Sequence, residues 1–255
     1  LAISADLDYA LVVREVNQYG DIEVRQFSPG KAINGKNSGQ DIALNPRDKI
    51  IIFNFSDDVQ NRFELNKLVK QRVEKVTSLN TNSLISSDLF KAGFVQLDKS
   101  RLTQRTQLAG VVVTDKTESE DVAVVKGVVN KMLANLFDDT ELLKLSNQMA
   151  RQELLYPVMV KLNNQGRAGA GIQVVGLDGQ VRLPGLYPLT AGARVNDLVV
   201  AAGGLKEGAY TTRAELTSTV VDNSGSKTEH KNIDLALALQ NNSSANLLLS
   251  GRDIL

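Results

Sequence analysis

The stretch Val181–Gly204, VRLPGLYPLTAGARVNDLVVAAGG, combines strand-like, turn-like and helix-like signals in one short span. Just before it, apolar residues alternate on both sides of Asp178-Gly179, a pair that suits the type I′ turn of a tight hairpin. The sequence therefore predicts a hairpin across this pair. The apolar positions expected on its inner face are Ile172, Val174, Gly176, Val181 and Leu183.

The rest of the stretch predicts a corner and a short helix. Pro184-Gly185 matches a type II turn and is expected to end the hairpin, because proline fixes φ and glycine supplies a positive φ. One helical stripe follows, at Val195, Leu198, Val199 and Ala202. Gly203 is expected in the left-handed conformation that stops a helix, with Gly204 beside it. Asp197 is expected to cap or pair locally.

The remaining C-terminal residues predict a sheet. Residues 214–220 alternate, a polar turn surrounds Asn223-Ser224-Gly225, and two further strand-like pieces end at Ile233 and Leu255. A small mixed sheet crossed by one helix is the β-grasp arrangement, and the predicted fold class is α+β.

The two ends of the chain share an internal repeat. ALVVREV (10–16) aligns with AELTSTV (214–220), and FSPGKAI (27–33) aligns with IDLALAL (233–239). IALNPRDKI (42–50) matches LLLSGRDIL (247–255) with the same Leu-x-x-Arg-Asp spacing. Residues 1–55 are therefore predicted to form the second half of the module found complete at 172–255. Such a half would expose its core, unless upstream residues or another chain supply the missing hairpin and helix.

Residues 56–171 contain stretches in which apolar residues recur with helical spacing, and they are predicted to join the two β-rich units. Helical spacing runs through Val59, Phe63, Leu65, Val69 and Val73, with Asp57 or Asp58 as the expected cap. A second helical stretch, 108–137, is interrupted by an acidic loop at 117–121, and a third runs from Thr140 toward Leu162. Pro157 should kink the third stretch or lie in the first turn of a new helix. NNQGRAGAG is the expected linker.

Composition excludes several function classes. Lys plus Arg equals Asp plus Glu, at 29 each, so nucleic acid is not an expected partner. The absence of cysteine excludes disulfides, iron–sulfur clusters and thiol catalysis. No run of about 18 apolar residues is present, so no membrane-spanning helix is expected. The chain starts without a signal-peptide pattern and ends inside a strand-like piece, which favours a fragment of a longer protein.

The segment VVGLDGQVRLPGLYPLTAGARVNDLVVAAGGLKEGAY resembles the SLBB (soluble-ligand-binding β-grasp) domain of bacterial polysaccharide export proteins. The matching positions are Gly176, Val181, Pro184, Gly185, Tyr187, Leu189, Val195, Asp197, Leu198, Ala202, Gly203, Gly204 and Leu205. The resemblance covers residues 172–255, and residues 1–55 through the repeat. RQELLYPVMVKLNNQ is similar to the segment that precedes this domain in larger members.

The resemblance implies a non-enzymatic structural module of a capsular or exopolysaccharide export protein that is periplasmic or attached to the outer membrane. Its expected partners are copies of itself, other export components and the polysaccharide. The family's N-terminal export motif, its lipid-bearing cysteine and a C-terminal membrane helix are absent from this sequence, so any membrane contact is expected through other parts. The alternative is a soluble periplasmic module that binds a glycan or a small ligand.

Catalysis has weak support in the sequence, and no cofactor or metal is expected. His230 lies in a polar segment without a serine elbow or second metal ligand nearby. A solvated helix start explains the acidic group Glu118, Glu120 and Asp121 better than a pair of facing glycosidase carboxylates does. The glycines of AGAG precede a strand, whereas a phosphate-binding loop follows one. Basic residues at 67–75 alternate with glutamates, as on a solvated helix face.

Sugar binding is the stronger ligand hypothesis, although aromatic residues are few. Tyr187, next to the Pro-Gly corner, and Tyr210, after the Gly-Gly stop, are the candidates for stacking on sugar rings. Arg182 and Arg213 are the candidate partners for hydroxyls or carboxylates. The competing structural interpretation places Tyr187 in the core beneath the helix and Arg213 in water. On that interpretation the strand, the Pro-Gly turn and the helix have a structural role, as a unit that can be repeated and stacked.

Overall fold

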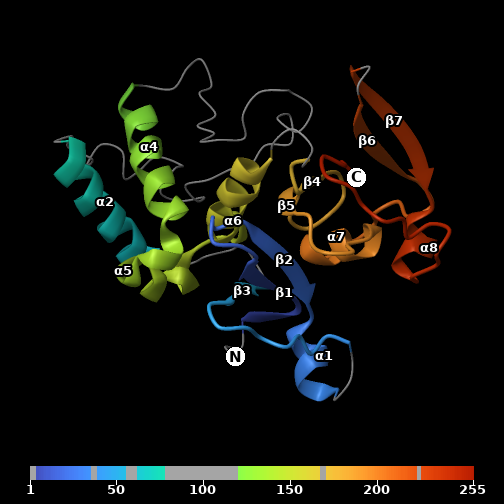
Figure 1. Ribbon diagram of the computed structural model, residues 1–255, viewed down its shortest axis with the longest axis horizontal. Helices are drawn as coiled ribbons and strands as arrows, with labels where there is room; N and C mark the ends of the chain where they lie inside the picture. The colour runs from blue at the N-terminus through green and yellow to red at the C-terminus, as the bar shows by residue number, and fades with distance from the viewer. Residues whose placement is uncertain (1–3, 36–38, 56–61, 78–119, 167–170, 223–224) are drawn as a thin grey trace.

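The computed structural model describes residues 4–35, 39–55, 62–77, 120–166, 171–222 and 225–255 (Figure 1). It has small antiparallel sheets at both ends of the sequence and helices in the middle, so the predicted α+β class is confirmed. The buried apolar side chains of all three regions form one cluster. Among the described residues, no helix is both long and apolar enough to cross a bilayer.

The N-terminal sheet contains β1 (Ala5–Glu15), β2 (Ile22–Phe27) and β3 (Lys49–Asn54), all antiparallel, in the order β2-β1-β3. Leu11, Val24 and Phe53 are buried on one face of the sheet, and the central strand β1 is buried on both faces from Tyr9 to Val13. A short helix, α1 (Pro29–Asn34), follows β2. Ser28 caps it, and the Lys31 N–H donates to the Ser28 Oγ.

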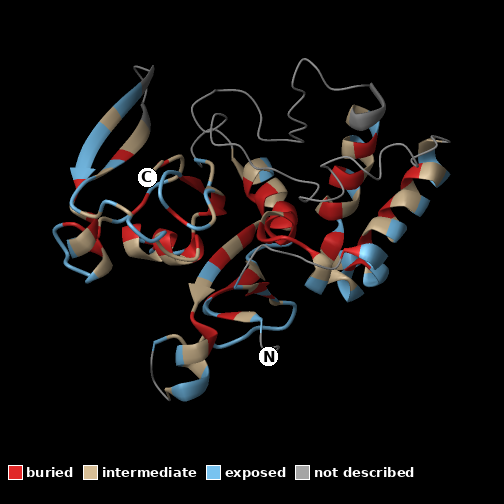
Figure 2. Ribbon diagram, turned by 180° about the vertical axis from the view of Figure 1, so that it is seen from behind, coloured by how far each residue is buried: buried red, intermediate tan, exposed pale blue. Residues whose placement is uncertain are grey.

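The middle region contains α2 (Phe63–Thr77), α4 (Glu120–Ala134), α5 (Thr140–Lys144) and α6 (Arg151–Gln165), with short 3-10 turns η3 (Leu136–Asp138) and η4 (Ser146–Gln148). The predicted stripe of α2 is confirmed at Leu65, Val69 and Val73, which are buried, whereas Phe63 is exposed. Figure 2 shows the buried sides of α2 and α4. The predicted caps Asp57 and Asp58, and Val59, lie outside the described residues.

The third helical stretch differs from the prediction. The chain forms α5 and η4 and then begins a separate helix, α6, at Arg151. Glu153 caps that start, because its Oε2 accepts the Ala150 N–H at 2.7 Å. Pro157 lies inside α6, beyond its first turn. The break therefore comes before the proline, where the start of α6 is capped.

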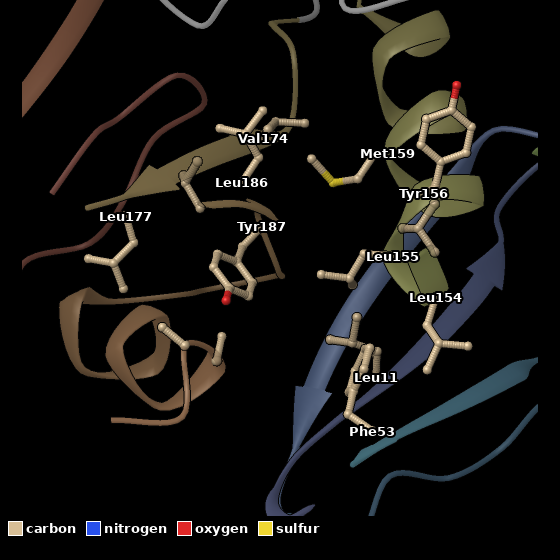
Figure 3. Packing of buried hydrophobic residues seen from close by; sticks show 14 of the residues in the cluster. Leu11, Phe53, Leu154, Leu155, Tyr156, Met159, Val174, Leu177, Leu186 and Tyr187 are labelled. Carbon is tan, nitrogen blue, oxygen red and sulfur yellow. The ribbon is translucent and has the colours of Figure 1, made fainter. Parts of the chain in front are cut away.

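α6 is the central helix of the molecule. It lies between the N-terminal sheet and the C-terminal strands β4 (Val174–Leu177) and β5 (Gly185–Pro188) (Figures 1 and 3). Its buried apolar side chains face both sides and are Leu154, Leu155, Tyr156, Val158, Met159 and Leu162. At its end, the Gln165 side chain accepts the Ile22 N–H at 2.8 Å and donates to the Ile22 carbonyl at 3.0 Å. The helix thus joins the two β-rich units and covers part of the β2 edge.

The C-terminal hairpin has a different register from the predicted one. β4 pairs with β5, from Val174 opposite Pro188 to Leu177 opposite Gly185, so the loop runs over 178–184. Residues 180–183 instead pair with the chain after the next helix: Arg182 N–H donates to Gly204 O at 3.0 Å, and Val181 bridges Leu205. Pro184-Gly185 is therefore the entry to β5 rather than the end of the hairpin.

The predicted helix is confirmed as α7 (Val195–Ala201). Val195, Leu198, Val199 and Ala202 are all buried. Gly203 has φ +74, as expected after a helix, and Gly204 has φ +88. These two glycines turn the chain back beside residues 180–183, which therefore pair with the chain after α7. β4 pairs with residues 185–188 instead.

Gly203→Ala is expected to lower the free energy of unfolding by about 1–2 kcal/mol, the cost of a left-handed alanine. A Cβ there would meet Arg182 Cβ at 3.6 Å, an ordinary contact, so the backbone conformation alone carries the cost. Chemical denaturation measures the change. Gly127→Ala is the control, because Gly127 lies within α4 with open space and alanine favours a helix. A Gly203→Ala variant as stable as the parent would contradict this assignment.

The module closes with β6 (Ala214–Asp222), β7 (Gly225–Ile233), α8 (Leu235–Leu239) and the terminal segment. β6 and β7 pair along their whole length and project from the body of the molecule (Figure 1). The terminal segment lies between β6 and β4: Ile254 bridges Thr217 on one side and Gly176 on the other.

The internal repeat has a counterpart in the strand registers. Ala10 pairs with Phe27 as Ala214 pairs with Ile233, which are the residues that the sequence alignment equates. Val13 pairs with Lys49 as Thr217 bridges Ile254. The two ends of the chain are therefore paired in the same way.

The turn before each final strand is also the same. Arg47 and Arg252 both have φ +73, unusual for residues other than glycine. Asp48 Oδ2 accepts the Asn45 N–H at 2.7 Å, and Asp253 Oδ2 accepts the Ser250 N–H at 2.8 Å. The boundaries of the predicted half module at 1–55, the insert at 56–171 and the complete module at 172–255 remain predictions.

Candidate functional site at the junction of the β-rich units

The buried Arg151 guanidinium, at the start of α6, bonds to groups of both β-rich units. Its Nη2 donates to Asp6 Oδ2 at 2.6 Å and to Asn54 O at 3.0 Å, and its Nη1 donates to Ala201 O at 2.5 Å. The side chains of Arg151 and Asp6 are only 1% and 2% exposed. Arg151 therefore ties the edge of the N-terminal sheet to the end of α7.

Aromatic rings surround this ion pair. The Arg151 guanidinium carbon lies 5.2 Å from the ring centroids of both Tyr9 and Phe53, which stack on each other at 4.9 Å. Tyr187 meets Tyr9 edge to face, at 6.5 Å between centroids. Burial raises the pKa of the Tyr9 hydroxyl, because a phenolate there would lose its hydration. The junction is thus a packed, water-excluded centre that holds one paired charge of each sign.

A second buried ion pair fixes the start of α6 to the helical region. Arg62 donates from both terminal nitrogens to the Glu153 carboxylate, at 2.7 and 2.8 Å. Arg62 also donates to Gln148 O at 3.1 Å. Because Arg151 and Glu153 belong to the same helical turn, α6 is anchored in two directions from one point.

A cleft of about 180 Å³ opens beside the Arg151 centre, between the N-terminal sheet and the end of α7. It is lined by Asp6, Asp8, Ser28, Lys31, Phe55, Val200, Gly203 and Gly204. Phe55 is 49% exposed, and the Arg182 guanidinium lies over its ring, 5.1 Å from the centroid. Pockets for drug-sized ligands measure about 300–1,000 Å³, so this smaller cleft suits a single sugar ring or one inserted side chain.

The structure separates the predicted ligand-binding residues. Tyr187 is 1% exposed and its hydroxyl donates to Leu183 O at 2.5 Å, so it belongs to the core, as the structural interpretation stated. It has no open ring face for a glycan. Tyr210 is 73% exposed, and Arg213 is exposed with its Nε donating to Asn232 Oδ1 at 2.9 Å. Arg182 alone of the four is beside the cleft.

The predicted structural residues have backbone roles. Asp197 accepts the Arg194 N–H at 2.8 Å and so caps α7 locally, as expected. Gly176 donates its N–H to Asp253 O at 2.8 Å within the strand pairing. Gly185 has φ +152, and a Cβ there would come within 2.8 Å of the Gln152 side chain. Pro184 precedes this close approach of β5 to α6.

His230 does not form a catalytic relay with its neighbours. Its Nδ1 contacts Glu215 Oε1 at 3.1 Å and also Thr217 Oγ1 at 3.3 Å. In a catalytic triad, the acid and the nucleophile bond to opposite ring nitrogens, whereas here both contact the same one. The His230 and Glu215 side chains are also more than half exposed. This group is a solvated cross-strand contact.

The remaining candidates are a metal site, the basic stretch of α2 and the acidic group at 118–121. No group of His, Asp and Glu suited to a metal ion occurs among the described residues. Arg72, in the basic stretch of α2, is paired with Asp139 and Glu141, and the Arg72 guanidinium holds the pKa of the Asp139 carboxyl below its ordinary value. Glu118 lies outside the described residues, as do the side chains of Glu120 and Asp121.

Comparison with known proteins gives one match. The family model of the SLBB domain matches residues 174–228. These residues form an SLBB domain. The matched span contains β4, β5, α7, β6 and the start of β7. No curated protein and no solved structure matches the chain.

Sequence reasoning missed the residues that hold the SLBB domain to the rest of the chain. Arg151 and Glu153 stand in RQELLYPVMV, where two charges precede an apolar helical run. Charged residues are almost never fully buried unless they are paired, so the sequence indicates a polar helix start there. Their partners Asp6 and Arg62 lie 145 and 91 residues away, and nothing in the local pattern identifies them.

Proposed function

We propose that this chain is a non-enzymatic structural module of a bacterial capsular or exopolysaccharide export protein. The observation that carries the proposal is the SLBB domain at 174–228, held to a second β-rich unit by the buried Arg151 centre. A block fixed at several points keeps one shape, which suits a part that is repeated around a hydrated path. In this proposal the protein is periplasmic or attached to the outer membrane, and any membrane contact is made through parts other than the residues of this sequence.

The proposed mechanism is assembly without chemistry. The described residues contain paired or solvated ionisable groups and no convergent acid–base set. Copies of the module, or of the module and other export components, would pack side by side. The equal numbers of acidic and basic residues, 29 each, leave no net charge to oppose this packing.

Self-association is the direct test of this proposal. Sedimentation velocity over a wide concentration range is expected to show species heavier than the 27.7 kDa chain, and chemical crosslinking should trap the same species. A monomer at every concentration, both for this chain and for the full-length protein that contains it, would overturn the assembly role. Turnover of a polysaccharide by the purified chain would overturn the non-enzymatic role.

The alternative function is capture of a glycan or small ligand by a soluble module, and the cleft beside Phe55 favours it. An exposed aromatic ring with Lys31, Asp8 and Arg182 around it offers one stacking face and several hydrogen-bonding groups. Within this alternative, the glycan contact is expected at this cleft rather than at the buried Tyr187. Tyr210 and Arg213 remain surface candidates.

Phe55→Ala is expected to abolish the calorimetric signal of oligosaccharide binding if the cleft is the ligand site. The matched control is Tyr19→Ala, because Tyr19 is an aromatic residue with 83% exposure outside the cleft. Tyr210→Ala and Arg213→Ala test the surface candidates in the same titration. Binding that survives Phe55→Ala, Tyr210→Ala and Arg213→Ala would exclude these three sites. Binding by a strictly monomeric protein would favour capture over assembly.

A further inference from the structure

The N-terminal sheet has one open edge with an apolar face beside it. In the described part of the chain, β3 pairs with β1 and has no strand on its other side. Several large apolar side chains of this unit are exposed: Ile50 by 48% and Ile52 by 37% on β3, Leu44 by 54% in the preceding segment and Ile33 by 69% on α1. α6 covers the opposite face, where Ile51 and Phe53 are buried. An open edge of this kind is a template for a further strand.

The equivalent residues of the C-terminal unit are covered. The repeat equates Leu44 with Leu249, which is 5% exposed. It equates Ile33 with Leu239 and Ile50 with Leu255, and both leucines pack against the core. The same positions are therefore buried or partly buried in the C-terminal copy and exposed in the N-terminal one.

The structure shows what covers them in the C-terminal copy. β4 runs parallel to the terminal segment: Gly176 N–H donates to Asp253 O at 2.8 Å, and Leu255 N–H donates to Gly176 O at 3.0 Å. The start of α7 lies beside the preceding residues, where Val195 N–H donates to Leu247 O at 3.1 Å. A strand of a hairpin and a short helix together complete this copy.

The same backbone groups are placed on the open edge of β3. The repeat equates Asp48 with Asp253 and Ile50 with Leu255, and both final strands pair in the same register with the strand before them. Because peptide groups alternate in direction along a strand, the Asp48 carbonyl and the Ile50 N–H point away from β1. They are positioned to bind a parallel strand as Asp253 and Leu255 bind β4.

We propose that the open edge of β3 and the apolar face of Ile33, Leu44 and Ile50 bind a β-hairpin followed by a short amphipathic helix. The segment is of the kind that residues 174–201 form here and is supplied by a partner other than a second copy of this chain. Its first strand runs parallel to β3, and its helix lays an apolar stripe on Leu44. Backbone bonds supply affinity and the apolar contacts supply specificity.

One sequence difference limits how the segment enters. A Cβ at Gly251 would lie 2.1 Å from Ile172 O, so the residues before β4 pass directly over that glycine. The repeat places Pro46 at the same position of the N-terminal unit. The bound segment must therefore begin at the residue matching Val174, or approach β3 by another path before it.

A graft tests the proposal on the whole chain. Residues 174–208 are duplicated and placed directly before Ala5, which precedes Ala10 by as many residues as Ala209 precedes Ala214, so the graft leads into β1 as the native segment leads into β6. Hydrogen exchange of the Ile50 and Ile52 amides is expected to slow by ~10-fold or more, and the thermal midpoint to rise. The Thr217 amide, in the unchanged C-terminal sheet, reports that the chain is folded.

The control graft carries Val195→Asp and Leu198→Asp in the duplicated copy, which removes the apolar stripe of its helix. It is expected to leave the Ile50 amide as fast as in the parent. In a second arm, residues 174–208 are added to the parent as a separate polypeptide, and protection of β3 should rise with its concentration. Unchanged β3 exchange in both arms, or equal protection by the control graft, overturns the proposal.

A second copy of the chain is the other occupant that the experiment detects. If β3 is already protected in the parent and its protection grows with chain concentration, copies of this chain pair through that edge. That result overturns the proposed hairpin-and-helix partner while it supports self-association. If the graft leaves the hydrogen exchange of β3 unchanged while the chain still self-associates, this inference fails and the proposed assembly function stands.

Discussion

Arg151→Met is expected to lower the free energy of unfolding by about 3–5 kcal/mol, because removing one partner of a buried ion pair leaves the other charge uncompensated. Asp6, whose side chain is 2% exposed, would lose its partner at 2.6 Å. The Asn54 and Ala201 carbonyls would lose their donor at the same time. Chemical denaturation followed by circular dichroism measures the change.

Two further variants identify the cause. Arg213→Met changes an exposed arginine in the same way and is expected to stay within about 0.5 kcal/mol of the parent. In Arg151→Met combined with Asp6→Asn, the buried charge is gone while the side-chain oxygen still accepts the Asp8 and Tyr9 N–H groups, so part of the loss should return. A cost below about 1 kcal/mol for Arg151→Met alone would contradict the role assigned to this residue.

Tyr187→Ala is expected to cost about 3–5 kcal/mol, the range for removing a large aromatic side chain from a core. Tyr187 is 1% exposed and packs edge to face on Tyr9, between α6 and the helix of the SLBB domain (Figure 3). Tyr187→Phe keeps the ring and removes the bond to Leu183 O, so it should cost about 0.5–1.5 kcal/mol. Thermal and chemical unfolding measure both variants.

Tyr210→Ala is the matched control, since the Tyr210 side chain is 73% exposed. It is expected to change stability by no more than about 0.5 kcal/mol. Equal losses for Tyr187→Ala and Tyr210→Ala would contradict the division into one core tyrosine and one surface tyrosine. A stable Tyr187→Ala variant that has lost glycan binding would return Tyr187 to the ligand candidates.

Short-range patterns predicted the helix of the SLBB domain correctly. The spacing of Val195, Leu198 and Val199 and the stop at Gly203 are set by helix geometry and by the backbone freedom of glycine, both of which can be read locally. The repeat was also readable, because it rests on the Leu-x-x-Arg-Asp motif, in which both Arg47 and Arg252 adopt φ +73.

The hairpin register was wrong for a long-range reason. Asp178-Gly179 has the composition of a tight turn, and Gly179 does adopt φ +87. However, Arg182 and Leu183 pair with the chain at 202–204, after α7, and this pairing depends on the fold of the whole unit. Gly179 adopts the positive φ that a tight turn needs, but tertiary pairing determines which strands meet.

The candidate site was predictable only in part. Arg182 was selected as a polar partner for a ligand and does lie beside the cleft, over Phe55. Phe55 itself, Lys31 and Asp8 belong to the N-terminal unit, and no local pattern groups them with Gly203, which lies about 150 residues or more along the chain. The role of Arg151 was not predictable for the same reason, since its hydrogen-bond partners come from β1, β3 and α7.

Calorimetric unfolding of the intact chain tests most directly whether the SLBB domain and the N-terminal sheet form one block through α6. The expected result is a single transition whose calorimetric and van't Hoff enthalpies agree, because Arg151 and the shared apolar cluster couple the two β-rich units. Two separate transitions, one of them unchanged in Arg151→Met, would contradict a joined building unit.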